Sequence, residues 1–203
     1  IQLLWGFAIL CALALAAQIP AMRHLGYPLA VLTTAPACLF GLITARRPLA
    51  PWLGAIGAWV IFALIVEPIW GCDTLGGLAW TVLGPLVGAS FGLAVGRCLQ
   101  LILQLRSWRY GWACALIIAI DLAALAWRLY DQPQVMVLDP FIGYIHGPIY
   151  DHWVPIDGPV VTGRLLILAL AAALLLLSLR RSRRPLDWVL IAFALAAVSY
   201  DAL

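Results

Sequence analysis

Residues 78–101 read LAWTVLGPLVGASFGLAVGRCLQL, a stretch in which Arg97 is the one charged residue. A transmembrane α-helix needs about 20 predominantly apolar residues to cross a hydrocarbon core of about 30 Å. This stretch is long enough, and its hydrophobic residues are not confined to one helix face. It therefore predicts a membrane-spanning helix.

Similar apolar runs recur along the whole sequence. Of its 203 residues, 65% are hydrophobic and 10% are charged, and the mean hydropathy is +1.03. Soluble domains contain about 25% charged residues, so an ordinary soluble fold is excluded. We predict an all-α, multi-pass integral membrane helix bundle with about seven transmembrane helices, forming a single domain over residues 1–203. The expected spans are residues 1–20, 29–45, 51–66, 78–101, 110–127, 161–179 and 188–202.

The arginines indicate how these spans are oriented. Arginine pairs or clusters occupy every second connection: Arg46 and Arg47, then Arg106 and Arg109, then Arg180, Arg181, Arg183 and Arg184. The positive-inside rule puts these connections in the cytoplasm, which gives an inside N-terminus and an outside C-terminus. Because the chain opens at Ile1 and stops at Leu203, we expect it to be part of a longer chain. The composition suits a bacterial inner (plasma) membrane.

The charged and cysteine residues exclude several classes of protein. All 12 basic residues are arginine, and without lysine no retinal or pyridoxal phosphate Schiff base can form. No cofactor is predicted. The net charge of +3 is too small and too scattered for a nucleic-acid partner. The five cysteines are spread singly, without metal-ligand spacing.

Glycines recur at every fourth position of the 78–101 stretch, on one helix face. Glycine costs about 1 kcal/mol in a helix interior, so this glycine zipper predicts close approach by another backbone. Packing within the chain and a seam between homo-oligomer or partner subunits both remain open. Ser90 lies in a G-x-S-x-G match, but a nucleophile elbow needs a strand-to-helix turn, so we expect helix packing. The glycines are Gly84, Gly88, Gly92 and Gly96.

Asp121 is the carboxylate placed well inside a predicted span, seven residues before Arg128. Ionisable groups within a membrane are costly and often functional. Asp121 could serve a proton or cation relay. Alternatively, it hydrogen-bonds to a neighbouring helix or pairs with an arginine near the outer boundary.

The longest connection, residues 128–160, is predicted to be a structured outward loop. Its aromatic and aliphatic residues suit a segment that lies in the membrane interface or folds back onto the bundle. Histidine and carboxylate side chains could bind a divalent metal, with His146, Asp151 and His152 as the candidate ligands, and the alternative is interfacial packing. The binding candidates in this loop are Asp139, Tyr144, His146, Tyr150, Asp151, His152 and Asp157.

No motif ties the chain to a family, so the functional hypothesis rests on the predicted topology and the outer loop. We expect a non-catalytic membrane anchor or scaffold that positions an outward-facing domain or partner complex. The expected partners are membrane lipids and either protein subunits or further copies of the chain. One alternative is a small-solute or ion transporter or channel that uses Asp121. Another is an outward-facing hydrolase embedded in the membrane, with or without a metal.

Overall fold

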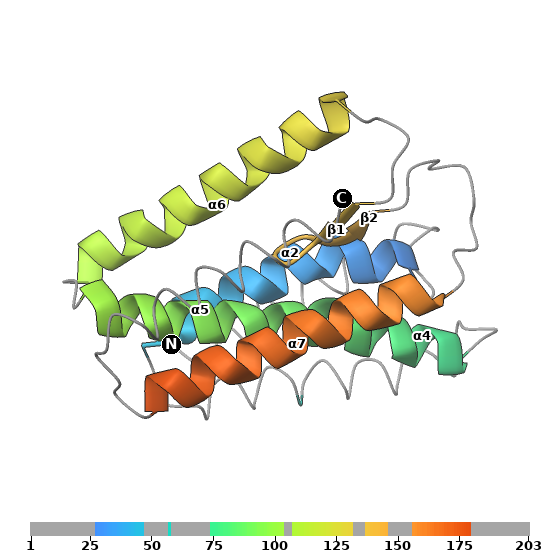
Figure 1. The fold of residues 1–203 in the computed structure, drawn as a ribbon, viewed down its shortest axis with the longest axis horizontal. Helices are drawn as coiled ribbons and strands as arrows, with labels where there is room; N and C mark the ends of the chain where they lie inside the picture. Colours follow the sequence, from blue (N-terminus) through green and yellow to red (C-terminus); the bar gives the residue numbers. More distant parts are fainter. Residues whose placement is uncertain are drawn as a thin grey trace.

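The computed structural model describes residues 27–46, 57, 74–103, 107–131, 137–145 and 156–179. This part of the chain is mostly helical (Figure 1). Its helices are α2 (Tyr27–Thr44), α4 (Thr74–Thr81), the π-helical segment η2 (Val82–Leu86), α5 (Val87–Leu103), α6 (Ser107–Asp131) and α7 (Gly158–Leu179). A short hairpin of β1 (Val137–Asp139) and β2 (Gly143–Ile145) precedes α7.

Four of the seven expected spans coincide with described helices. The stretches Tyr27–Thr44, Leu75–Leu101, Trp108–Arg128 and Gly158–Ser178 are long and apolar enough to cross a membrane. The predicted helices are therefore confirmed for these four, and their length and apolar composition agree with membrane spans. The expected spans 1–20, 51–66 and 188–202 lie outside the described residues, apart from Gly57.

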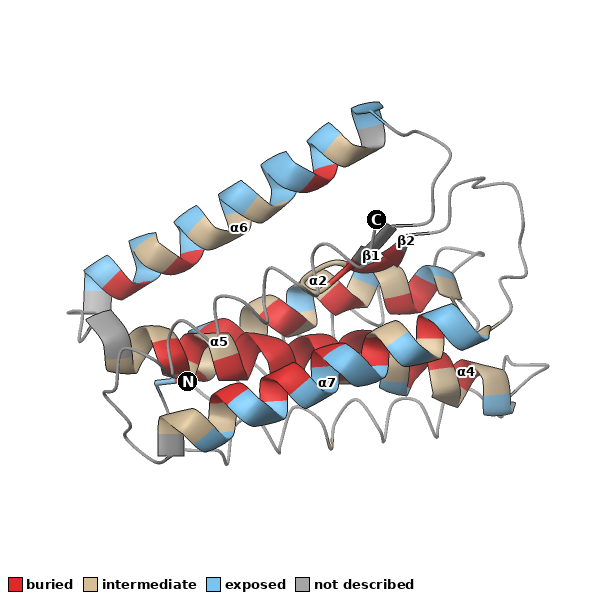
Figure 2. Cartoon of the chain, in the orientation of Figure 1, coloured by how far each residue is buried: buried red, intermediate tan, exposed pale blue. Residues whose placement is uncertain are grey.

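The core of the bundle lies along α5. Helix α2 packs against one side of α5 and α7 against another, and buried residues follow α5 along its length (Figure 2). Proline lacks the N–H that an α-helix needs, and the π-helical turn of η2 accommodates Pro85 between α4 and α5. The main hydrophobic cluster comprises Cys38, Val87, Phe91, Ala94, Cys98, Ile167, Leu170, Ala171 and Leu174.

Helix α6 packs less closely and diverges from the other helices towards its C-terminal end (Figure 1). A row of large apolar side chains on it is exposed, including Leu116 and Ile120. Exposed Trp108 and Trp127 stand near its two ends, about 28 Å apart along an ideal helix. That spacing matches the thickness of a bilayer core, whose boundaries tryptophan favours. The exposed face of α6 therefore suits contact with lipid.

Candidate functional site

The hairpin folds back onto the bundle rather than extending away from it. Its strands pair in antiparallel register, with Leu138 opposite Tyr144 and Asp139 opposite Gly143. At its tip, the Phe141 ring meets the ring of Phe91 edge-on, with 5.2 Å between centroids. Phe91 is fully buried within the Leu75–Leu101 span, so the tip reaches membrane depth. One of the two positions anticipated for this loop, packing against the bundle, is therefore found for residues 137–145.

Backbone that is not helical needs hydrogen-bond partners at such a depth, because lipid supplies none. The Asp139 carboxylate meets part of this need, since its Oδ1 accepts hydrogen bonds from the N–H groups of Phe141 and Ile142, both at 2.8 Å. The Asp139 carbonyl accepts a long hydrogen bond of 3.5 Å from Nη1 of Arg164 on α7. Asp139 and Arg164 together thus supply hydrogen-bond partners for two N–H groups and one carbonyl in the turn of the hairpin.

Arg164 is among the most deeply buried large side chains in the described part of the chain, with 2% of its surface exposed. It lies in the second turn of α7, next to Asp139, which is 5% exposed. A buried cation is costly unless it is paired, and the negative charge of Asp139 supplies that compensation. The pair joins α7 to the hairpin.

Asp121 joins the same group from α6. Its carboxyl interacts electrostatically with the Asp139 carboxyl and with Arg128 on its own helix. Asp121, Asp139 and Arg164, here called the polar cluster, therefore connect α6, the hairpin and α7.

Aromatic rings cover the neighbouring face of the hairpin. Tyr144 of β2 stacks on Trp80 of α4 with 6.3 Å between centroids, and Tyr27 of α2 meets both rings edge-on at 5.2 and 6.2 Å. Burial raises the pKa of Tyr144 to about 12, and the nearby Asp157 and Tyr27 add to this effect. Tyr144 therefore stays neutral at physiological pH.

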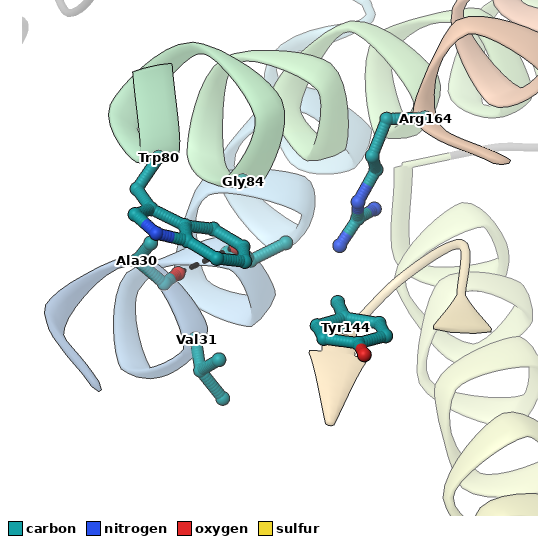
Figure 3. A pocket seen from close by; sticks show the side chains of 7 residues that line it. Ala30, Val31, Trp80, Gly84, Tyr144 and Arg164 are labelled. Carbon is teal, nitrogen blue, oxygen red and sulfur yellow. Dashed lines mark hydrogen bonds between the residues drawn. The ribbon is translucent and has the colours of Figure 1, made fainter. Parts of the chain in front are cut away.

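A small hollow lies between Trp80, Tyr144 and Arg164 (Figure 3). The space inside it has room for about one water molecule, so it is too small for an organic ligand. Trp80 and Arg164 flank it from α4 and α7, and Thr34 directs its hydroxyl to the Ala30 carbonyl at 2.6 Å.

The remaining candidate residues of the outer loop divide into two groups. Asp157 stands before α7, where its Oδ1 accepts a hydrogen bond from the Val160 N–H at 3.3 Å, as an N-cap residue does. The other candidates, His146, Tyr150, Asp151 and His152, lie outside the described residues. Among the residues that are described, no three His, Cys, Asp or Glu side chains are grouped to hold a metal ion. The metal site stays a prediction.

The four glycines of the predicted zipper, Gly84, Gly88, Gly92 and Gly96, all face α2. A Cβ on Gly84 or Gly88 would lie 2.9 Å from the Thr34 side chain, and one on Gly92 would overlap the Cys38 carbonyl. At Gly96 it would lie 2.5 Å from the Ala45 Cβ. These contacts are within the chain.

Ser90 lies within α5 and donates to the Leu86 carbonyl at 2.8 Å, so the strand-to-helix turn of an elbow is not found there.

Arg164 is the residue of this site that sequence reasoning missed. Its position three residues into the expected span 161–179 suggested an exposed outer charge, but α7 begins at Gly158 and carries Arg164 into the bundle. The signal was present, because Arg164 is followed directly by an apolar run.

The sequence matches no protein-family model, no characterised protein and no solved structure. The residues themselves must therefore indicate what the chain does.

Proposed function

We propose that the chain is a membrane-embedded scaffold whose outer loop forms a fixed platform for a partner domain or subunit. The observation that carries this proposal is the use of Asp139 and Arg164. Both side chains bond to the hairpin itself. The Asp139 carboxylate accepts from N–H groups of the turn, and the Arg164 guanidinium donates to the Asp139 carbonyl. Polar groups engaged in this way hold a segment in place rather than await a substrate.

The charge distribution supports an outward position for this platform. The described carboxylates, Asp121, Asp131, Asp139 and Asp157, lie in the hairpin, before α7 or in the second half of α6. Arg46, Arg97 and Arg109 belong to the opposite end of the helices. Under the positive-inside rule the hairpin faces outward, and we propose seven spans in a bacterial inner membrane, with the N-terminus inside and the C-terminus outside.

Photo-crosslinking from two positions on α6 tests the scaffold function. Tyr130 is 82% exposed near the hairpin end, and Trp112 is 70% exposed near the other end. A photoreactive phenylalanine analogue at position 130 should give an adduct with one protein species of defined mass, whereas the analogue at position 112 should give lipid adducts alone. The adduct from position 130 should disappear in Arg164→Met, because the hairpin is then released. The proposal is wrong if position 130 gives no protein adduct, or if the purified chain moves a solute by itself in liposomes.

A second candidate function, proton transfer, is favoured by the electrostatic interaction between Asp121 and Asp139. Two interacting carboxyl groups near an arginine are the kind of group found in proton pathways. Liposomes that contain the chain and an internal pH-sensitive dye should then acidify under a negative internal potential, and Asp121→Asn should abolish this flux. Asp131→Asn, an exposed carboxylate on the same helix, is the matched control and should leave the flux unchanged. A wild-type flux equal to that of empty liposomes rules this function out.

A further inference from the structure

Two buried polar side chains from different helices border the small hollow beside the hairpin. They are Thr34 of α2 and Arg164 of α7, with 1% and 2% of their surfaces exposed. Between them the hollow is walled by apolar and aromatic groups from α2, α4 and β2 (Figure 3). What the two polar groups can bond to therefore decides what the hollow can hold.

The Arg164 guanidinium has more donors than the described residues satisfy. A guanidinium carries five N–H donors and no acceptor. Within the described part of the chain, Arg164 makes one hydrogen bond, from Nη1 to the Asp139 carbonyl, and this bond is long at 3.5 Å. Lipid supplies no acceptor at this depth. An acceptor inside the hollow would therefore lower the cost of burying the remaining donors.

The Thr34 hydroxyl offers acceptor capacity to the same hollow. Its proton is committed, because Oγ1 donates to the Ala30 carbonyl at 2.6 Å, but the lone pairs of a hydroxyl oxygen can still accept. Oγ1 lies on the side of Gly84, 2.9 Å from where a Cβ on that glycine would stand, and Gly84 also lines the hollow. The structure shows no direct hydrogen bond between Thr34 and Arg164. A donor and an acceptor thus border one hollow without meeting.

The size of the hollow and the nature of these two groups select its occupant. The space has room for about one water molecule. A molecule that bridges the two groups must accept from the guanidinium and donate to the Thr34 oxygen, and water does both. A halide ion could accept from Arg164 but has no hydrogen to donate to Thr34. The Asp139 carboxylate already compensates the charge of Arg164, so a neutral occupant fits better than an anion.

We propose that the hollow is a binding site for one water molecule, which bridges the Arg164 guanidinium and the Thr34 hydroxyl. Buried waters typically bond to two to four polar groups that the protein leaves unsatisfied. This water joins α2 to α7 beside the hairpin and adds to the direct bond between Arg164 and Asp139. The site does not depend on the scaffold function, because it needs no partner protein.

Radiolytic hydroxyl-radical labelling of the full chain in detergent micelles tests this site. Irradiation of an ordered water produces radicals that oxidise the aromatic rings beside it. Trp80 and Tyr144 line the hollow, whereas Phe91 belongs to the main hydrophobic cluster and does not. After correction for intrinsic reactivity, Trp80 and Tyr144 should be oxidised several times faster than Phe91. Equal rates for the three rings would overturn the proposal.

Replacing Thr34 with valine removes the hydroxyl that holds the water and keeps the branched shape of the side chain. Labelling of Tyr144 should then fall towards the rate of Phe91. Thr33→Val is the matched control, because Thr33 donates to the Leu29 carbonyl at 2.6 Å in the same way but does not line the hollow. It should leave the labelling of Tyr144 unchanged, and equal labelling in the two valine variants would refute the bridging role of Thr34.

Thr34→Ser keeps the hydroxyl and should retain the wild-type labelling of Tyr144. This variant keeps the role of the hydroxyl testable if Thr34→Val does not fold, and loss of labelling in it would contradict the proposal.

Exchanging chloride for sulfate in the buffer distinguishes water from a halide ion. Labelling of Trp80 and Tyr144 should be the same in both buffers, since water occupies the hollow in each. Faster labelling after chloride is removed would show that a halide occupies the hollow, and the water site would then be wrong.

Discussion

A Cβ placed on Gly143 would lie 2.6 Å from Nη2 of Arg164, so the hairpin backbone and the guanidinium occupy a space that admits no side chain between them. Gly143 also has a φ of +116°, a conformation that other residues rarely adopt. Steric fit and backbone conformation thus independently require glycine at this position. The contact explains how an arginine of α7 comes close enough to the hairpin to donate to the Asp139 carbonyl.

Replacing Gly143 with alanine should lower the free energy of unfolding by about 2–4 kcal/mol. The estimate combines about 1–2 kcal/mol for the left-handed backbone with about 1–3 kcal/mol for crowding of the guanidinium. Unfolding in detergent micelles, followed by circular dichroism, measures the loss. Gly158→Ala is the control, since Gly158 is exposed and a Cβ there meets nothing within 4 Å. Equal stability of Gly143→Ala and the wild type would contradict the role given to this glycine.

Replacing Arg164 with methionine should release the hairpin from α7. Methionine keeps the apolar part of the side chain but removes the donor to the Asp139 carbonyl and the charge beside Asp139, a loss of about 2–4 kcal/mol. Hydrogen exchange of the amides of residues 137–145 should become faster. Leu165→Met, at an exposed neighbouring position on α7, should leave this exchange unchanged. Unaltered exchange in Arg164→Met would show that the guanidinium does not hold the hairpin.

Replacing Gly92 with alanine should push α2 and α5 apart. The added Cβ would overlap the Cys38 carbonyl oxygen and lie 3.0 Å from its sulfur, and such crowding costs about 1–3 kcal/mol. Gly111→Ala on α6 is the matched control, because a Cβ at Gly111 meets nothing within 4 Å. Alanine there should stabilise the helix by up to about 1 kcal/mol. Thermal unfolding in micelles distinguishes the two variants, and a neutral Gly92→Ala would mean that this contact can relax without cost.

The helices of this fold were more predictable from sequence than its hairpin. Apolar length alone located α2, α5, α6 and α7, because a membrane span is set by the thickness of the bilayer. Contacts within the polar cluster join residues that are far apart in sequence, and no local pattern encodes such pairing. Asp121 interacts electrostatically with Asp139 of the hairpin as well as with Arg128 on its own helix, and only the second of these is close to it in sequence.

Arg164 shows why the site was only partly predictable. Arginine near the end of an apolar run usually extends towards the headgroups, so its charge suggested exposure. Its burial depends on a hairpin whose turn offers a carbonyl and a negative charge at the same depth. That hairpin depends in turn on the Asp139 carboxylate, which the sequence offered only as a binding candidate, and on Gly143, which does not stand out in the sequence. A buried charge of this kind becomes predictable only after its partner has been placed.

Tyr144 should resist ionisation until the pH approaches 12. Burial raises its pKa from the ordinary value of 10.0 to about 12, so the unfolded chain releases this proton first. Tyr144 therefore makes no pH-dependent contribution to stability near neutral pH, and stability falls as the pH rises from about 10 towards 12. The free energy of unfolding of Tyr144→Phe should fall less steeply in that window. The wild-type minus Tyr144→Phe difference in absorbance at tyrosinate wavelengths checks this, and a transition near pH 10 would contradict it.

Replacing Tyr110 with phenylalanine should loosen the end of the bundle where α6 meets α2 and α5. The variant removes the hydroxyl that donates to the Leu42 carbonyl at 2.6 Å and keeps the ring under Arg46. A buried hydrogen bond of this kind contributes about 1–2 kcal/mol, and thermal unfolding in micelles should show that loss. Because the ring is retained, the effect of Arg46→Gln should add to that of Tyr110→Phe within about 0.5 kcal/mol. A larger coupling would mean that Arg46 acts through the hydroxyl and not through the ring, and the position of the guanidinium would then depend on the bond between α6 and α2.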